Sequence, residues 1–210
     1  MSVSLVNARD SANAELVRGG VSSGLALPAT KQSISMLGGR FKVEHWRNGK
    51  RIDEFHFNNG ITNEGKNKLL NVMFDSGTPI TTWWLGAIDT VSYTQLQATD
   101  DYLDINQTSD QWKEFTNYTD GNNSDNATTR PAWGPGAASG QSITNATTAV
   151  FNITASGTVK GVFAVGGISN AQTKNDHTTG GTLWATALFS AGDVPVTSGD
   201  QLKVTYTVSC

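Results

Sequence analysis

The chain has 210 residues with a formal net charge of −3, and 16% of its residues are charged. This length allows one large or two small domains with a substantial core. The charge does not indicate direct binding to nucleic acid, because phosphates are bound by clustered lysine and arginine side chains. No apolar run approaches the ~18 residues of a membrane-spanning helix, and the first residues do not resemble a secretion signal. We therefore expect no membrane association. The one cysteine, Cys210, cannot form an internal disulfide.

Residues 1–39 differ from the rest of the chain, because apolar side chains are scattered through them without a helical or strand period. The composition alone is typical of a disordered tail. The apolar content instead favours an extended N-terminal arm that becomes ordered on a neighbouring subunit. The residues that we expect to bind the partner are Leu5, Val6, Leu16, Val17, Leu25, Leu27 and Met36.

A folded domain is predicted from Arg40 onwards, and it begins with a hairpin. Residues 41–46 and 51–57 have strand patterns and flank Asn48-Gly49, a strong signal for a tight turn. A strict two-residue turn would place Phe41 opposite His56. A register shifted by one residue places Phe41 opposite Phe57 and gathers the apolar residues on one face. We therefore expect a bulge or a longer loop in this hairpin.

One helix is predicted at residues 63–74, lying across the sheet. Thr62 or Asn63 can cap its first turn, and the five apolar residues from 69 to 74 supply an apolar flank. Residues 82–88 then have the pattern of a buried strand. We expect Trp83 and Trp84 there, and Trp184 in a later strand, to lie in the core or in an interface.

Residues 89–147 form an irregular excursion from the domain, in which a short strand is expected within residues 112–118. Long loops of this kind often carry binding residues. Trp112 and Trp133 are therefore the candidates for exposed aromatic residues that stack on a ligand or fill a partner's pocket.

The last sixty residues contain four segments in which apolar and polar side chains alternate, and residues rich in glycine, serine and threonine separate them. These segments are residues 149–154, 159–165, 183–189 and 202–208. A period of two predicts strands with a buried face, and four strands at short spacing favour an antiparallel arrangement. The predicted fold of residues 40–210 is mainly β: an antiparallel β-sandwich of the jelly-roll or Ig-like type, with one short α-helix and an extended N-terminal arm.

Few residues indicate chemistry. His45, His56 and His177 have no metal-ligand spacing, and His45 is expected to pair with Asp53 across the hairpin. The alternating Asp120–Asn126 segment resembles a calcium loop, but Pro131 stands where the final glutamate is needed. A glycosidase needs two carboxylates at a set separation, and Asp100, Asp101, Asp104 and Glu114 could supply them, although such clusters are usually solvated. We expect no metal, no cofactor and no enzymatic activity.

Several segments resemble a group of tailed-bacteriophage virion proteins. They are residues 61–70, Trp83-Trp84-Leu85-Gly86, Arg130-Pro131-Ala132-Trp133, residues 140–145, residues 182–185 and the end of the chain from Phe189 to Val208. The resemblance covers residues 41–208 and leaves the arm outside. It implies a small β-rich structural protein made alongside capsid and tail components.

The function expected from these observations is that of a non-enzymatic virion protein, assembled in the host cytoplasm. A capsid cement or decoration protein is the first hypothesis, with the β-domain on major capsid subunits and the arm reaching to neighbours. We expect a homo-oligomer, for which a trimer suits a capsid three-fold axis. A tail, collar or adaptor component is the first alternative, and a carbohydrate-binding module that uses Trp112 and Trp133 is the second.

Overall fold

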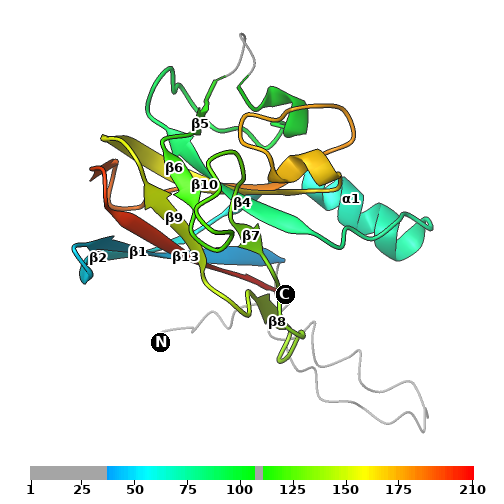
Figure 1. Ribbon diagram of the computed structural model, residues 1–210. Helices are drawn as coiled ribbons and strands as arrows, with labels where there is room; N and C mark the ends of the chain where they lie inside the picture. Colours follow the sequence, from blue (N-terminus) through cyan, green and yellow to red (C-terminus); the bar gives the residue numbers. More distant parts are fainter. Residues whose placement is uncertain (1–36, 107–110) are drawn as a thin grey trace, which may run out of the picture. The chain divides into compact units, whose positions relative to one another are not determined.

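The computed structural model describes residues 37–106 and 111–210, which form two antiparallel sheets and one α-helix, α1 (Asn63–Phe74) (Figure 1). The first sheet has the order β2 (Lys50–Asn58), β1 (Gly38–Arg47), β13 (Gln201–Ser209), β9 (Ala149–Ile153) and β6 (Tyr118–Asp120), and β8 (Ser142–Thr144) also pairs with β13. The predicted mainly β fold with one helix is confirmed. The seven residues proposed for the arm contacts, from Leu5 to Met36, lie outside the described residues.

The second sheet has the order β3 (Gly60–Ile61), β11 (Thr182–Leu188), β10 (Gly157–Gly166), β4 (Trp83–Asp89) and β5 (Glu114–Phe115). Two short strands join it at other points, since β12 (Val194–Val196) pairs with β10 and β7 (Ala132–Trp133) pairs with β4. Two short 3₁₀ helices, η1 (Tyr102–Asp104) and η2 (Ser169–Gln172), lie in the connecting segments. All four strands expected in the last sixty residues are present, whereas β12 was not predicted.

The β1–β2 hairpin has the shifted register expected from the sequence. Phe41 lies opposite Phe57 and Val43 opposite Phe55, and the register changes between His45 and Trp46. The turn at Asn48-Gly49 has positive φ at both residues, as tight hairpin turns require. The bulge therefore gathers the aromatic residues of both strands on the buried face.

The main core lies between the two sheets. Phe41, Phe151 and Val204 from the first sheet and Leu85 and Val162 from the second belong to one cluster of buried side chains. Because side chains alternate along a strand, these residues occupy one face of each sheet. The packing of two antiparallel sheets across this core gives a sandwich.

The second sheet is also covered on its other face, and this explains why β10 is almost entirely buried. Phe163, Val165 and Leu183 point away from the main core and pack with Tyr102 and Trp112. The last two residues belong to the irregular segment between β4 and β6, so this excursion folds back over the sheet. It contains a short strand within the expected range, β5, and β6 begins at the last residue of that range.

Candidate functional site: an apolar groove beside helix α1

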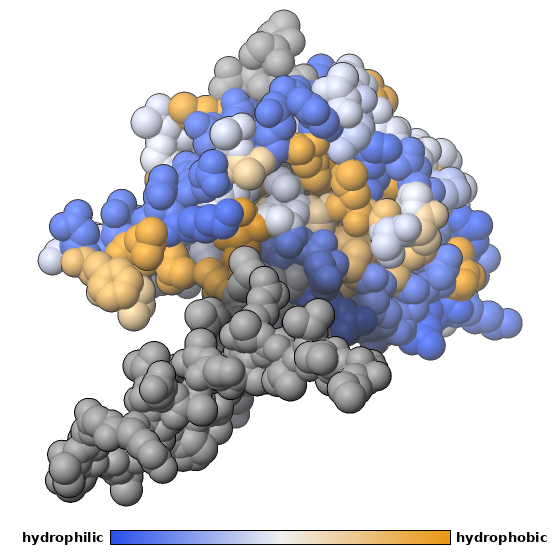
Figure 2. Space-filling view, turned by 180° about the vertical axis from the view of Figure 1, so that it is seen from behind, coloured by the Kyte–Doolittle hydropathy of each residue, from blue (hydrophilic) through white to orange (hydrophobic). Residues whose placement is uncertain are grey.

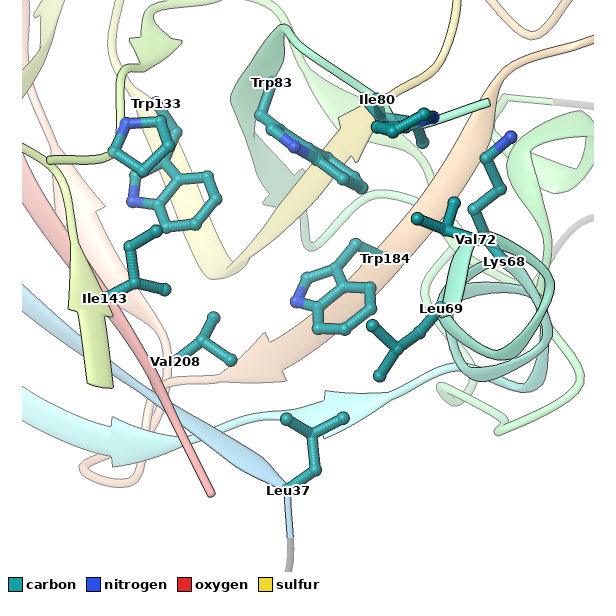
Figure 3. Close-up of a pocket in the computed structure, with 12 residues that line it drawn as sticks. Leu37, Lys68, Leu69, Val72, Ile80, Trp83, Trp133, Ile143, Trp184 and Val208 are labelled. Carbon is teal, nitrogen blue, oxygen red and sulfur yellow. The ribbon is translucent and has the colours of Figure 1, made fainter. Parts of the chain in front are cut away.

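The most distinctive surface feature is a groove of about 350 Å³ that opens where α1 meets the ends of the two sheets. Its lining comes from distant parts of the chain: Leu37, Lys68, Leu69, Val72, Pro79, Ile80, Trp83, Trp133, Pro135, Ile143, Trp184 and Val208. Figure 3 shows Leu69 and Val72 on one side of the hollow, Trp133 and Ile143 on the other, and Trp83 and Trp184 between them. Lys68 is the one charged residue among those twelve, so the groove is apolar.

Helix α1 forms one wall of the groove, and its first turn fixes its position. The Thr62 side chain, one of the two candidates from the sequence, caps the helix by accepting a 3.0 Å hydrogen bond from the Gly65 backbone N–H. Gly65 packs against Trp184, because a Cβ atom there would lie 2.6 Å from the Trp184 carbonyl oxygen. The Glu64 carboxylate accepts backbone hydrogen bonds from Tyr102 and Leu183. These contacts fasten the start of α1 to β11.

Glu64 is half-buried at this junction, and burial raises the pKa of its carboxyl. The backbone N–H groups of Tyr102 and Leu183 donate hydrogen bonds to Glu64 Oε2, at 3.0 and 2.6 Å. They lower the pKa of Glu64, because they stabilise the charged carboxylate. Glu64 thus joins η1 and β11 to the helix start, and its role here is structural.

The floor of the groove is a set of packed aromatic rings. The rings of Trp83 and Trp184 meet nearly edge to face at 5.9 Å between centroids, and Trp83 meets Trp133 at 6.5 Å. Trp133 packs on Tyr206 at 5.3 Å, and Tyr206 stacks on Phe41 at 4.1 Å. This chain of rings runs from the groove into the main core, so the floor is held in place by buried residues. Trp83 and Trp184 remain partly exposed.

Helix α1 leaves further apolar side chains in solvent. Leu70, Met73 and Phe74 are 53%, 64% and 81% exposed. The sequence predicted that these residues would belong to an apolar flank lying across the sheet. The structure differs because α1 approaches β11 through Gly65, its one fully buried residue. Figure 2 shows hydrophobic residues on the protruding left-hand part, which corresponds to α1 at the right of Figure 1.

Both tryptophans proposed as exposed binding residues are buried, so that prediction is wrong. Trp112 is 1% exposed, packs on Phe163 and donates a 3.0 Å hydrogen bond from Nε1 to Asp100. Trp133 is 6% exposed and donates from Nε1 to the backbone oxygen of Tyr206 at 3.0 Å. The physical reason is that the irregular segment folds against the sheets, where apolar rings gain more by burial than in a loop. Trp133 is nevertheless one of the residues that line the groove.

The acidic residues considered for a glycosidase pair all make internal hydrogen bonds. Asp100 accepts from the Gln97 backbone and from Trp112. Asp101 and Asp104 form a reciprocal capping box around η1. These contacts hold the turns of the irregular segment in place, and they account for the acidic cluster in structural terms. Burial raises the pKa of the Asp100 carboxyl.

Glu114 forms a fully buried ion pair with Arg130, which the sequence did not reveal. Arg130 Nε lies 2.9 Å from Glu114 Oε1 and Arg130 Nη2 lies 2.8 Å from Oε2. Tyr118 and the Asn175 backbone also donate to Glu114, and Arg130 donates to the carbonyl of Ala171. Burial alone lowers the pKa of Arg130, but the Glu114 carboxylate outweighs it and raises that pKa above its ordinary value. Both residues of the pair belong to the excursion, and the hydrogen bonds with Ala171 and Asn175 tie it to the rest of the domain.

The histidines lie apart from one another. His45 faces Asp53 across the hairpin as expected, but its Nε2 contacts Asp200 Oδ2 at 2.8 Å. His56 contacts Glu54, and His177 contacts the Asn175 carbonyl. Within residues 37–106 and 111–210, no three His, Cys, Asp or Glu side chains are grouped so that they could hold a metal ion. The same part of the chain contains no helix with the length and hydropathy needed to cross a membrane.

No protein-family model matches the chain, and no curated protein matches it. The resemblance to phage virion proteins therefore stays a prediction. The groove residues that the sequence did anticipate are Trp83 and Trp184, which were expected in the core or in an interface. Pro79 and Ile80 follow the helix in an irregular segment and gave no recognisable signal.

Proposed function

We propose that this protein is a non-enzymatic structural subunit of a bacteriophage virion, and that it acts as a capsid decoration protein bound to major capsid subunits. One observation carries the proposal: the β-domain presents an apolar groove beside α1, together with the exposed Leu70, Met73 and Phe74 of that helix. Exposed apolar surface of this kind is typical of a site that binds another protein. The phage setting comes from the resemblance of residues 41–208.

The lining of the groove favours a protein partner over a sugar. Carbohydrate and other small-molecule sites place several polar groups around the ligand to fix its orientation. Here Lys68 is the one charged residue among those that line the hollow, and Trp184 Nε1 is already hydrogen-bonded to Tyr206. The partly exposed rings of Trp83 and Trp184 instead suit aliphatic side chains of a protein. We therefore favour a protein partner over a carbohydrate.

A decoration role also accounts for the apolar composition of residues 1–39. A segment that buries apolar side chains only when it binds adds stability to the assembled state. Several weak contacts on one shell then act together through their high effective concentration. A closed oligomer such as a trimer would match a three-fold position on a capsid. A tail, collar or adaptor subunit is the alternative location, since it would use the same kind of surface.

The test is binding of the full-length protein to purified phage capsids that lack it. Three forms are compared: the wild type, the triple variant Leu70→Ser, Met73→Ser, Phe74→Ser, and the control Val91→Ser, which changes a 61% exposed apolar residue elsewhere. We expect saturable binding of the wild type and the control at a fixed ratio to the capsid subunit. The triple variant should bind at least about tenfold more weakly, since three apolar side chains lose their burial.

The outcomes separate the alternatives. Binding of the wild type to tails at a ring-like copy number, without capsid binding, would move the protein to the tail or collar. Failure to bind either particle would reject the virion proposal. Equal binding by the triple variant would show that the helix surface is not the contact.

A further inference from the structure

The groove has a feature that points to its occupant: Leu37, the first described residue, forms part of its wall. Figure 3 shows Leu37 across the hollow from Trp83, with Leu69 and Trp184 nearby. The 36 residues that precede Leu37 therefore start at the rim of an apolar groove. Neighbouring copies would present an identical groove and an identical starting point.

The composition of that preceding chain matches the groove in one segment. Residues 19–30 lie between Arg18 and Lys31 and carry no charged side chain. Within this segment Leu25 and Leu27 are two positions apart, so an extended backbone would place both side chains on one side. An uncharged segment with two leucines on one side suits a groove lined mainly by aliphatic and aromatic residues. The flanking Arg18 and Lys31 would lie in solvent beyond it.

The length of the preceding chain allows it to reach a neighbour. An extended chain advances ~3.3 Å per residue, so 36 residues span up to about 120 Å. A domain of this size has a diameter of roughly 40 Å. A segment of this length is long enough to reach a neighbouring copy, since even Leu27 can lie up to about 30 Å from Leu37.

We propose that the groove of one copy binds residues 19–30 of a neighbouring copy, with Leu25 and Leu27 inserted between α1 and the Trp83–Trp184 pair. The exposed Leu70, Met73 and Phe74 continue the apolar surface along α1. This surface is larger than the area that residues 19–30 alone would cover. A second copy covers more of that surface than a segment folded back on its own domain. Repeated exchange of the segment closes a symmetric dimer or ring.

This inference deepens the proposed assembly role and rests on it for the idea that copies meet. Its test uses only the purified full-length protein, so that its failure can be told apart from failure to bind capsids. Variant A carries Leu25→Asp and Leu27→Asp in the segment. Variant B carries Val72→Asp in the groove, at a half-buried position on α1. The matched controls are Val3→Asp with Ser4→Asp, outside the segment, and Val91→Asp, an exposed residue away from α1 and the groove lining.

The masses of the proteins in solution are measured by light scattering over a range of concentrations. The wild type and both controls are expected to form oligomers. Variants A and B alone are expected to be monomers, with association weakened by about 100-fold or more. An equimolar mixture of A and B should form a dimer, because the intact segment of B can bind the intact groove of A. Circular dichroism checks that both variants are folded.

Three results would overturn the proposal. If the wild type were monomeric over the whole concentration range, residues 19–30 of one copy would not bind the groove of another. Oligomers formed by variant A alone would place the contact between copies elsewhere. Folded monomers of A and B that stay separate when mixed would indicate a segment that binds its own domain, or another occupant.

Discussion

The indole Nε1 of Trp184 donates a 2.8 Å hydrogen bond to the phenolic oxygen of Tyr206, and this bond joins the two sheets beneath the groove. Trp184 belongs to β11 of the second sheet and Tyr206 to β13 of the first. The Asn59 side chain also donates to the same oxygen, at 2.9 Å. Tyr206 is almost completely buried, and burial raises the pKa of its hydroxyl. The hydrogen bond to Tyr206 therefore fixes the ring of Trp184, which forms part of the groove floor.

Replacing Tyr206 with phenylalanine tests this contact. The ring would still pack on Phe41, but two donors, Trp184 Nε1 and Asn59 Nδ2, would lose their acceptor. An unsatisfied buried polar group costs about 1–3 kcal/mol, so we expect the free energy of unfolding in urea to fall by about that amount. Thr207→Val, which alters an exposed hydroxyl contact of the same strand, is the control and should change stability by less than about 0.5 kcal/mol. Equal stability of Tyr206→Phe and wild type would contradict this role.

Gly65 permits the close approach of α1 to β11. A Cβ atom at this position would lie 2.6 Å from the carbonyl oxygen of Trp184, which is backbone and cannot rotate away. Gly65→Ala should displace the helix and lower stability by about 1–3 kcal/mol, even though alanine favours helices. At Gly60 the nearest atom to an added Cβ is 4.0 Å away, so Gly60→Ala should be nearly neutral. Thermal unfolding of the two variants, followed by tryptophan fluorescence, compares them directly; an unchanged melting temperature for Gly65→Ala would count against the tight contact.

The Arg130–Glu114 pair is expected to matter more for stability than any exposed ion pair. Arg130→Met leaves the Glu114 carboxylate buried without its partner, which costs about 3–5 kcal/mol. The Lys160–Asp193 pair has a similar separation, 2.7 Å, but lies at the surface. Lys160→Met should therefore cost at most about 1 kcal/mol. Urea unfolding measures the loss of stability in each variant. Similar losses in Arg130→Met and Lys160→Met would show that burial does not determine how much an ion pair contributes.

The hairpin, the helix and the late strands could be predicted because their signals are local. The register of Phe41 with Phe57 followed from the alternation of apolar residues and from the turn at Asn48-Gly49. The helix boundaries followed from the Thr62 cap and the apolar positions after it. In contrast, β12 has only three residues around Pro195, too short for a period to be recognised.

The candidate site could not be predicted, because distant residues form it. The groove combines Leu37 with Trp133 and Val208, and no window of sequence brings these positions together. The burial of Trp112 likewise depends on Phe163, which lies 5.3 Å away between ring centroids but 51 positions later in the chain. A tryptophan in an irregular segment carries no local sign of whether such a partner exists. The sequence therefore identified residue types suited to binding without showing which of them are exposed.

The carboxylate of Asp200 is buried, and its contacts make the stability of the protein depend on pH. Arg47 donates two 2.7 Å hydrogen bonds to it, and the Thr197 backbone and His45 contact it at 2.9 and 2.8 Å. The hydrogen bonds from Arg47 are the main cause that holds the pKa of Asp200 well below its usual range, against the effect of burial. A carboxyl whose pKa is lower in the folded state stabilises the protein above its unfolded pKa of about 3.9. That stabilisation is lost as the pH falls from about 5 towards 2.

Asp200→Asn should remove this pH-dependent stabilisation. At pH 7 the variant should be less stable than the wild type, because an amide accepts weaker hydrogen bonds from Arg47 than a carboxylate does. As the pH falls from about 5 towards 2, the difference in the free energy of unfolding should shrink because the wild-type carboxylate is protonated. Burial raises the pKa values of Glu64, Asp100 and Asp120, but both proteins share these groups, so their contributions cancel in the comparison. The exposed Asp193→Asn serves as the control, and a difference between Asp200→Asn and wild type that persists unchanged down to pH 2 would refute the assignment.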